Sequence, residues 1–342
     1  MAKGKINMDI GKFPPDMLAE LLLQTASTDP RIIVGPGIGE DASVLDMGDT
    51  CLVVTSDPIT FASDSIGWHA VQVNANDIAC SGAVPKWFLP TLMVPTHTTE
   101  KQASEIFSQI VQACSEIGVA VIGGHSEVTS GITQPIVSGT MLGEVQKTDI
   151  IKTGGAVEGD SIVLTKGIAI EGTSILARDF SDALRLQNVP EEALNAAATL
   201  LDTLSISVLK DARIACSTVK VNSLHDPTEG GLATAIREVA HASGLGAAIE
   251  EGSVPIFPEC TNVCTPLGIN PFGLLSSGAL LITLHSAEVP SLLSALSLEG
   301  ITGWEIGQML APEEGLLMIT TEGELPLPEF PRDELARFIA TL

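Results

Sequence analysis

The chain has 342 residues, of which 45% are hydrophobic, and this size and composition predict a globular protein with room for two domains. Its 42 Asp and Glu outnumber its 17 Lys and Arg, giving a formal net charge of −25, so long-range repulsion disfavours nucleic acid and anionic membranes as partners. The sequence has no apolar run of the roughly 18 residues that a membrane span requires, and no apolar stretch follows its basic N-terminal residues, so a cytoplasmic location is expected.

The first half of the sequence alternates between predicted strands and helices. A short amphipathic helix is expected over 15–24 and a loop over 27–46. The clearest helix covers 100–117, where apolar residues recur every three or four positions, with a capping box at Thr99 and Gln102 and a stop at Gly118. Strand-like runs occur at 51–55, 87–94, 119–122 and 136–145.

A glycine-rich turn over 152–160 leads into a second group of predicted elements. The expected strands cover 161–165, 247–250, 279–284, 302–309 and 316–320. The expected helices cover 171–180, 191–201, 204–215 and 232–242, and a short helix closes the chain within 331–342. This order predicts a second α/β layer structure rather than a repeat array.

Four polar clusters interrupt these apolar segments. They are the loop GPGIGEDA (35–42), Asp57 at a strand end, Asn74 with Asp77 on one helical face, and the glycine and carboxylate segments GGHSEVT (123–129) and HDPTEGG (225–231). Taken one at a time, each is explained at least as well by a turn, a cap or a solvated stripe of a helix.

Taken together, the carboxylates of these clusters suggest a metal site. Asp41, Asp57, Asp77, Glu127 and Asp226 each follow or flank a strand or a glycine turn, which is how oxygen ligands are assembled around a hard cation. Magnesium shares one or two carboxylates with phosphate oxygens, and the sequence contains no Gly-Lys-Ser/Thr phosphate loop. We therefore predict magnesium-dependent nucleotide binding.

Five segments of the chain resemble the superfamily of AIR synthase, the hydrogenase maturation protein HypE, thiamine-monophosphate kinase and selenophosphate synthetase. The segments are GIGEDASVL, VVTSDPI, GWHAVQVNANDIACSGAVPKW, VIGGHSEVT and LHDPTEGGLATAIREVA, which occur in the order of the family. Within this superfamily the chain most resembles HypE-like, AIR-synthase-related proteins. The resemblance implies two mixed α/β domains, covering 1–153 and 154–342. It also implies a homodimer whose N-terminal sheets form a shared barrel, with ATP bound in a cleft beside it.

The resemblance also implies roles for individual residues and a type of reaction. Members of the superfamily use ATP to phosphorylate a poor nucleophile or an amide-type oxygen, after which ring closure or dehydration can follow. Carried over by motif, Gly37, Gly39, Asn74, Asn76, Gly123 and Gly124 would bind the cofactor, Asp41, Asp57, Asp77 and Asp226 would hold Mg²⁺, and His125 and Glu127 would complete the site.

Some positions depart from the HypE pattern. No cysteine follows Cys264, so self-dehydration of a terminal thiocarboxamide is not expected, and Ser277 and Glu229 stand where HypE-like sequences have glutamate and arginine. The N-terminal glycine segment has no cysteine of the selenophosphate synthetase kind. Three alternatives therefore stay open: activation of an amide-type oxygen on a small molecule or a protein terminus, small-molecule phosphorylation of the thiamine-monophosphate kinase type, and a non-catalytic nucleotide-binding partner of a maturation factor.

Overall fold

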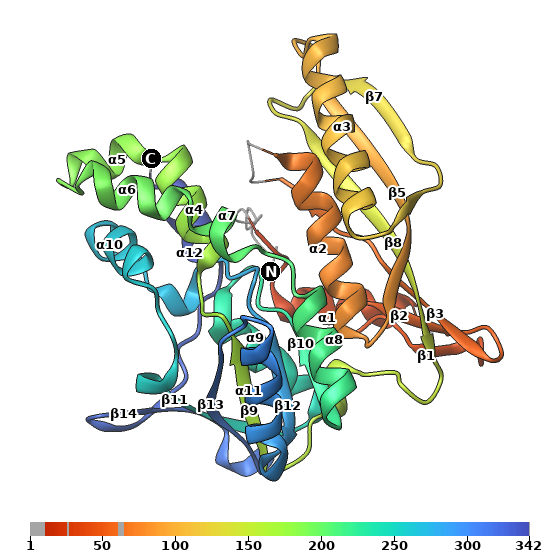
Figure 1. Ribbon diagram of the computed structural model, residues 1–342, viewed down its shortest axis with the longest axis vertical. Helices are drawn as coiled ribbons and strands as arrows, with labels where there is room; N and C mark the ends of the chain where they lie inside the picture. Colours follow the sequence, from red (N-terminus) through yellow and green to blue (C-terminus); the bar gives the residue numbers. More distant parts are fainter. Residues whose placement is uncertain (1–10, 26, 61–64, 342) are drawn as a thin grey trace, which may run out of the picture.

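The computed structural model describes residues 11–25, 27–60, 65–341 of the chain and shows two mixed α/β halves, each built on its own sheet (Figure 1). The two-domain α/β class predicted from the sequence is therefore correct, while the boundary after Thr153 stays a prediction. Among the described residues, every helix is too short or too polar to cross a bilayer.

The N-terminal sheet has the strand order β1-β2-β3-β8-β5-β6, with β4 also paired to β8 and β7 to β5. Its long strands β5 and β8 run antiparallel, and β8 buries alternate residues, as expected for a strand with one face against a core. Helices α2 and α3 pack beside each other along this sheet (Figure 1). The elements are α1 (Pro15–Leu22), β1 (Ile32–Val34), β2 (Ser43–Asp46), β3 (Thr50–Thr55), β4 (Pro58–Ile59), α2 (Ile66–Cys80), β5 (Val84–Pro95), α3 (Glu100–Glu116), β6 (Ala120–Val121), β7 (His125–Thr129) and β8 (Ile136–Gln146).

Helix α3 forms where its periodicity predicts. Thr99 accepts from the backbone N–H of Gln102, whose side chain accepts from the Thr99 N–H, so the predicted capping box is confirmed. Phe107 and Val111 of the same apolar repeat are nevertheless 45% and 46% exposed. The apolar face of α3 is therefore wider than the part of it that the sheet and α2 cover.

The prediction of a loop over 27–46 was wrong in part, because this segment contains two short strands. β1 and β2 pair antiparallel, with Ile32 opposite Leu45 and Val34 opposite Val44. Each strand is too short to show an alternating pattern, and the glycines between them mask the pairing. The two strands extend the sheet and place residues 35–42 at its end, facing the other half of the molecule.

The C-terminal sheet has the order β10-β12-β9-β13-β11-β14-β15, and only its β11–β14 pair is parallel among the described strands. Its elements are β9 (Asp160–Thr165), α4 (Ile170–Asp179), α5 (Ser181–Leu186), α6 (Glu191–Ala198), α7 (Leu200–Leu204), α8 (Leu209–Thr218), β10 (Val221–His225), α9 (Gly231–Ser243), β11 (Gly246–Glu250), α10 (Pro258–Leu267), β12 (Leu281–His285), α11 (Val289–Leu298), β13 (Gly303–Leu310), β14 (Leu316–Thr320), β15 (Gly323–Pro326) and α12 (Glu334–Ile339).

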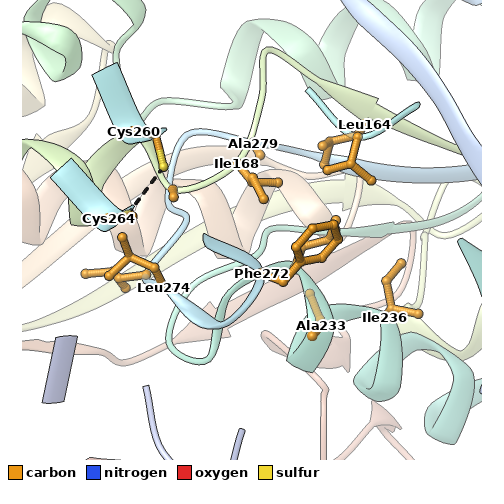
Figure 2. Close-up of a cluster of buried hydrophobic side chains, with 14 of the residues drawn as sticks. Leu164, Ile168, Ala233, Ile236, Cys260, Cys264, Phe272, Leu274 and Ala279 are labelled. Carbon is orange, nitrogen blue, oxygen red and sulfur yellow. Dashed lines mark hydrogen bonds between the residues drawn. The ribbon is translucent and has the colours of Figure 1, made fainter. Parts of the chain in front are cut away.

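The core of this half lies between the sheet and its helices. Figure 2 shows side chains from β9, α9, α10 and the 272–279 segment packed in one apolar cluster. Cys260 and Cys264 belong to it as free thiols on successive turns of α10, with 3.6 Å between their sulfur atoms. These two cysteines therefore act as small apolar side chains, as expected for buried thiols.

The helix predicted over 204–215 begins later than expected, at Leu209 in α8. The preceding residues form an irregular turn in which Ser205 has a φ of 61°, outside the helical region. The backbone groups of Ile206 and Val208 bond to the side chain of Asn76 on α2, in the other half of the chain. A tertiary contact therefore takes the place of the first helical turn.

Candidate functional site

The four aspartates predicted to hold metal lie together where the two halves meet. Asp41 precedes β2, Asp57 follows β3, and Asp77 lies in the last turn of α2, whereas Asp226 follows β10 of the C-terminal half. The charges of Asp57, Asp226 and Asp41 all act on Asp77. The fold therefore gathers carboxylates from four separate segments.

Asp77 is held in place by Thr55, the last residue of β3. Thr55 Oγ1 donates to Asp77 Oδ2 over 2.7 Å and lies 3.0 Å from the backbone carbonyl oxygen of Asp41. Burial raises the pKa of Asp77 well above its ordinary value, and repulsion from other carboxylates, Asp57 foremost, raises it further. In the absence of a cation, this cluster therefore favours bound protons.

Asp226 supplies an unsatisfied oxygen to the cluster. It is 2% exposed, and its Oδ1 accepts the thiol proton of Cys80 over 3.5 Å, while Oδ2 has no hydrogen-bond partner among the described residues. Burial, and after it the charge of Asp41, raise the pKa of Asp226 to about 7. A buried carboxylate oxygen without a donor is costly, and hard oxygen ligands are what a divalent cation such as Mg²⁺ requires. The donor set therefore fits this cation.

A histidine joins the two halves of the chain at the cluster. His225 Nδ1 lies 2.8 Å from Asp41 Oδ2, and its Nε2 lies 2.9 Å from Glu238 Oε2 on α9. Burial alone would lower the pKa of His225, but the two carboxylates raise it well above its ordinary value. An imidazolium that donates from both nitrogens therefore fixes Asp41 against the C-terminal half.

A lysine lies at the solvent edge of the cluster. Lys12 Nζ is 3.8 Å from Glu238 Oε1, and the lysine side chain is 55% exposed. Its partial burial opposes the charged form, yet the carboxylates of Glu238, Glu229 and others raise the pKa of Lys12 to about 12. A permanent positive charge therefore stands beside the acidic groups.

The two asparagines predicted to bind the cofactor are engaged in buried backbone contacts. Asn74 accepts from the Asp57 N–H over 3.0 Å and donates to the carbonyl oxygens of Asp57 and Ala70. Asn76 donates to the Ile206 carbonyl over 2.8 Å and accepts from the Val208 N–H over 2.9 Å. Asn74 thus positions the Asp57 turn, and Asn76 joins the N-terminal half to the C-terminal half. The cofactor roles of both asparagines stay predictions.

Replacing Asn76 with alanine is expected to lower the free energy of unfolding by about 1–3 kcal/mol, because the buried Val208 N–H and Ile206 carbonyl would lose their partners. Chemical denaturation of this variant and of Asn195→Ala, at an exposed position on α6, measures the difference. Equal stability of the two variants would contradict this link between the two halves. ATP affinity measured on the same variants reports whether Asn76 also touches the nucleotide.

The loop that carries Asp41 docks closely onto the C-terminal half. Gly39 has a φ of 80°, and a Cβ atom there would lie 2.9 Å from the Cβ of Glu238. Glycine is therefore required for the loop to reach α9. Gly37 lies two residues earlier in the same loop, and the predicted phosphate contacts of both glycines stay predictions.

His125 and Glu127 lie elsewhere, on the exposed edge strand β7. His125 Nε2 is 3.1 Å from Glu127 Oε2, and β8 and β5 separate β7 from β3 in the sheet. The preceding Gly123 and Gly124 lead the chain along β5, and a Cβ atom on Gly124 would lie 2.3 Å from the Pro90 carbonyl oxygen. Within one chain, strand β7 stands apart from strand β3, which Asp57 follows (Figure 1). Their catalytic and cofactor roles stay predictions.

Five residues of the cluster were not assigned to the site by the sequence prediction. These are Lys12, Thr55, Cys80, His225 and Glu238. Three had a usable signal, because Thr55 and His225 lie within two residues of predicted aspartates and Cys80 lies one helical turn after Asp77. Lys12 and Glu238 had none, since only the docking of distant segments brings them in.

This two-domain fold, with carboxylates converging between its halves, matches a known class of protein. Residues 39–145 match the AIR synthase related protein, N-terminal domain, and residues 157–319 match the AIR synthase related protein, C-terminal domain. The chain belongs to the AIR synthase related family, as the resemblance indicated.

Individual relatives are distant but cover most of the chain. A putative hydrogenase expression/formation protein of Methanocaldococcus jannaschii is 27% identical over 299 residues, which make up 84% of this chain and 84% of the relative. The carbamoyl dehydratase HypE of Rhodobacter capsulatus is 25% identical over 319 residues, or 91% of this chain and 90% of the relative.

Solved structures share the fold. AaThiL complexed with AMPPCP and TMP has a TM-score of 0.73 at 18% identity, covering 96% of this chain and 99% of that one. The hydrogenase maturation protein HypE in complex with ATP has a TM-score of 0.65 at 21% identity, covering 90% of this chain and 89% of that one.

Proposed function

We propose that this protein is an ATP-dependent enzyme that uses magnesium-bound ATP to phosphorylate, and so activate, an amide- or carbonyl-type oxygen. The observation that carries the proposal is the convergence of Asp41, Asp57, Asp77 and Asp226, where Asp226 Oδ2 is buried with no hydrogen-bond partner in the described part of the chain. Relatives named as HypE, one of them solved with ATP, support the same nucleotide and reaction class. The substrate would be a small molecule or a protein terminus, and the names of these relatives support a role in hydrogenase maturation as part of the proposal.

The residues of the cluster have distinct parts in this proposal. Bound magnesium would neutralise phosphate charge and make the terminal phosphoryl group more electrophilic. Thr55 and His225 hold two of the ligand carboxylates in fixed positions, as preorganised sites require. Lys12 places a positive charge beside the acidic groups, and this charge can attract a phosphate group of the nucleotide. The metal ligands would be Asp41, Asp57, Asp77 and Asp226.

Isothermal titration with a non-hydrolysable ATP analogue, with and without magnesium, tests this proposal. We expect saturable binding that strengthens when magnesium is present, because the carboxylates repel the phosphates unless a cation lies between them. Absence of binding in both conditions would remove the nucleotide function.

A second candidate is a small-molecule kinase, favoured by the fold likeness to AaThiL with AMPPCP and TMP. Product analysis separates it from the first. A phosphorylated metabolite that persists indicates a kinase, whereas free phosphate with a cyclised or dehydrated product indicates oxygen activation. Tight ATP binding without turnover on any candidate substrate would instead favour a non-catalytic partner of a maturation factor.

We also propose that two chains form a homodimer through their N-terminal sheets, as the resemblance implies, with a barrel shared between them. The exposed edge strand β7 supports this, since Val128 on it is 65% exposed and unprotected strand edges tend to be covered. Light scattering is expected to give twice the mass of the chain for the wild type. A Val128→Lys variant should shift the mass toward one chain, and a monomeric wild type would contradict the proposal.

A further inference from the structure

Cys80 adds a sulfur atom to the carboxylate cluster. It follows Asp77 by three residues on α2, so the two side chains share one face of the helix. Asp41, Cys80 and Asp226 each place one ligand atom within 4.8 Å of the other two. Cys80 is 2% exposed, so its thiol faces these carboxylates rather than solvent.

The spacing suits a metal ion between the sulfur and the carboxylate. Cys80 Sγ lies 3.5 Å from Asp226 Oδ1. A tetrahedral ion with a metal–sulfur bond of about 2.3 Å and a metal–oxygen bond of about 2.0 Å separates these two ligand atoms by about 3.5 Å. The second Asp226 oxygen is buried without a hydrogen-bond partner among the described residues, which independently indicates a site that can accept a cation.

We propose that Cys80, Asp41 and Asp226 form a mixed thiolate and carboxylate site that binds a first-row transition-metal dication, such as Fe²⁺, Co²⁺ or Zn²⁺, in preference to Mg²⁺. Thiolate ligands favour these softer ions, whereas Mg²⁺ favours oxygen ligands alone. On binding, the metal–sulfur bond forms, the S–H bond breaks, and the proton leaves to solvent. The proposal rests on the proposed function, in which two of these residues already hold metal, and it names the kind of ion that they select.

Cobalt titration of the metal-free protein, without nucleotide, tests the site. The wild type is expected to develop a near-ultraviolet thiolate-to-cobalt charge-transfer band that saturates with one Co²⁺. Cys80→Ser keeps a hydroxyl donor to Asp226, and we expect it to lose the band and bind Co²⁺ at least about tenfold more weakly, with Mg²⁺ affinity within about twofold of wild type. The matched control is Cys216→Ser, which removes an exposed cysteine outside the cluster and should keep the band.

Three outcomes would overturn the assignment: no charge-transfer band in the wild type, a band that persists in Cys80→Ser, or equal losses of Co²⁺ and Mg²⁺ affinity in that variant. The wild-type spectrum decides the first of these even if the variant fails to fold. Failure here is distinguishable from failure of the proposed function, because magnesium-dependent binding of the ATP analogue is measured separately and needs no sulfur ligand.

Discussion

Replacing Asp77 with asparagine is expected to weaken magnesium-dependent ATP binding by about 100-fold, since the change removes a full charge from the metal ligands and keeps the side-chain shape. The other three aspartates all act on Asp77, because the charges of Asp57, Asp226 and Asp41 raise its pKa after burial itself. A bound dication would reverse that repulsion. Titration calorimetry with the ATP analogue, with and without magnesium, measures the loss.

The same variant should be more stable than the wild type when no metal is present. Asparagine is neutral without taking up a proton, so the folded variant avoids the cost of protonating a buried carboxyl among other carboxylates, and its amide oxygen can still accept from Thr55. Gain of stability with loss of ligand binding is the pattern of a residue kept for function rather than for folding. Thermal unfolding of the metal-free proteins near neutral pH reports this second effect.

A surface carboxylate provides the control. Asp182 on α5 is 96% exposed in its side chain, and Asp182→Asn removes the same charge outside the cluster. We expect this variant to bind ATP and magnesium like the wild type. If Asp77→Asn also kept wild-type magnesium dependence, Asp77 would not be a metal ligand and the proposed site would lose its centre.

Local sequence signals predicted the fold well where the structure depends on local interactions. The helix predicted over 100–117 appears as α3 because its apolar spacing and its cap both act within a few residues. The predictions for 27–46 and 204–215 were wrong in part. A short pair of strands forms within the first segment, and the side chain of Asn76, from the other half of the molecule, bonds to the backbone at the start of the second. Such contacts leave no local periodicity.

The candidate site divides in the same way. Aspartates at strand ends and on a helical face could be predicted as a converging set, since those positions meet at the edges of layered α/β structures. The contacts that His225 makes with Asp41 and Glu238 could not be predicted, because they depend on how the two halves of the molecule dock. The resemblance also grouped His125 with the aspartates, although the sheet order places it on a distant edge strand.

The metal-free protein is expected to lose stability as the pH rises from about 5.5 to about 8, by a few kcal/mol in free energy of unfolding. Burial raises the pKa of both Asp226 and Asp333 to about 7. In the unfolded chain these carboxyls titrate near their ordinary value of about 4, so between these values the folded state binds more protons and stability falls as they are removed. The raised pKa of His225 acts in the same direction at higher pH.

Groups with lowered pKa values do not cancel this trend. Interaction with Arg31 lowers the pKa of Asp29 to about 2, and stability from such a carboxyl is lost only as the pH falls below its ordinary value of about 4. The window between about pH 5.5 and about pH 8 is therefore governed by the buried acids.

Thermal unfolding across this pH range, with and without magnesium, separates the two acids. Asp226 is a proposed metal ligand, so saturating magnesium should stabilise the protein most at high pH, where the cation need not displace a proton. Asp333, the N-cap residue of α12, instead accepts from the Leu335 N–H of that helix and from the Gly230 N–H at the start of α9, so Asp333→Asn should flatten the pH profile while leaving the magnesium response intact. Asp226→Asn should remove much of the magnesium response and part of the slope. A wild-type stability that does not change over this pH range would mean that these acids are not held protonated, and the electrostatic argument for a cation among them would fail.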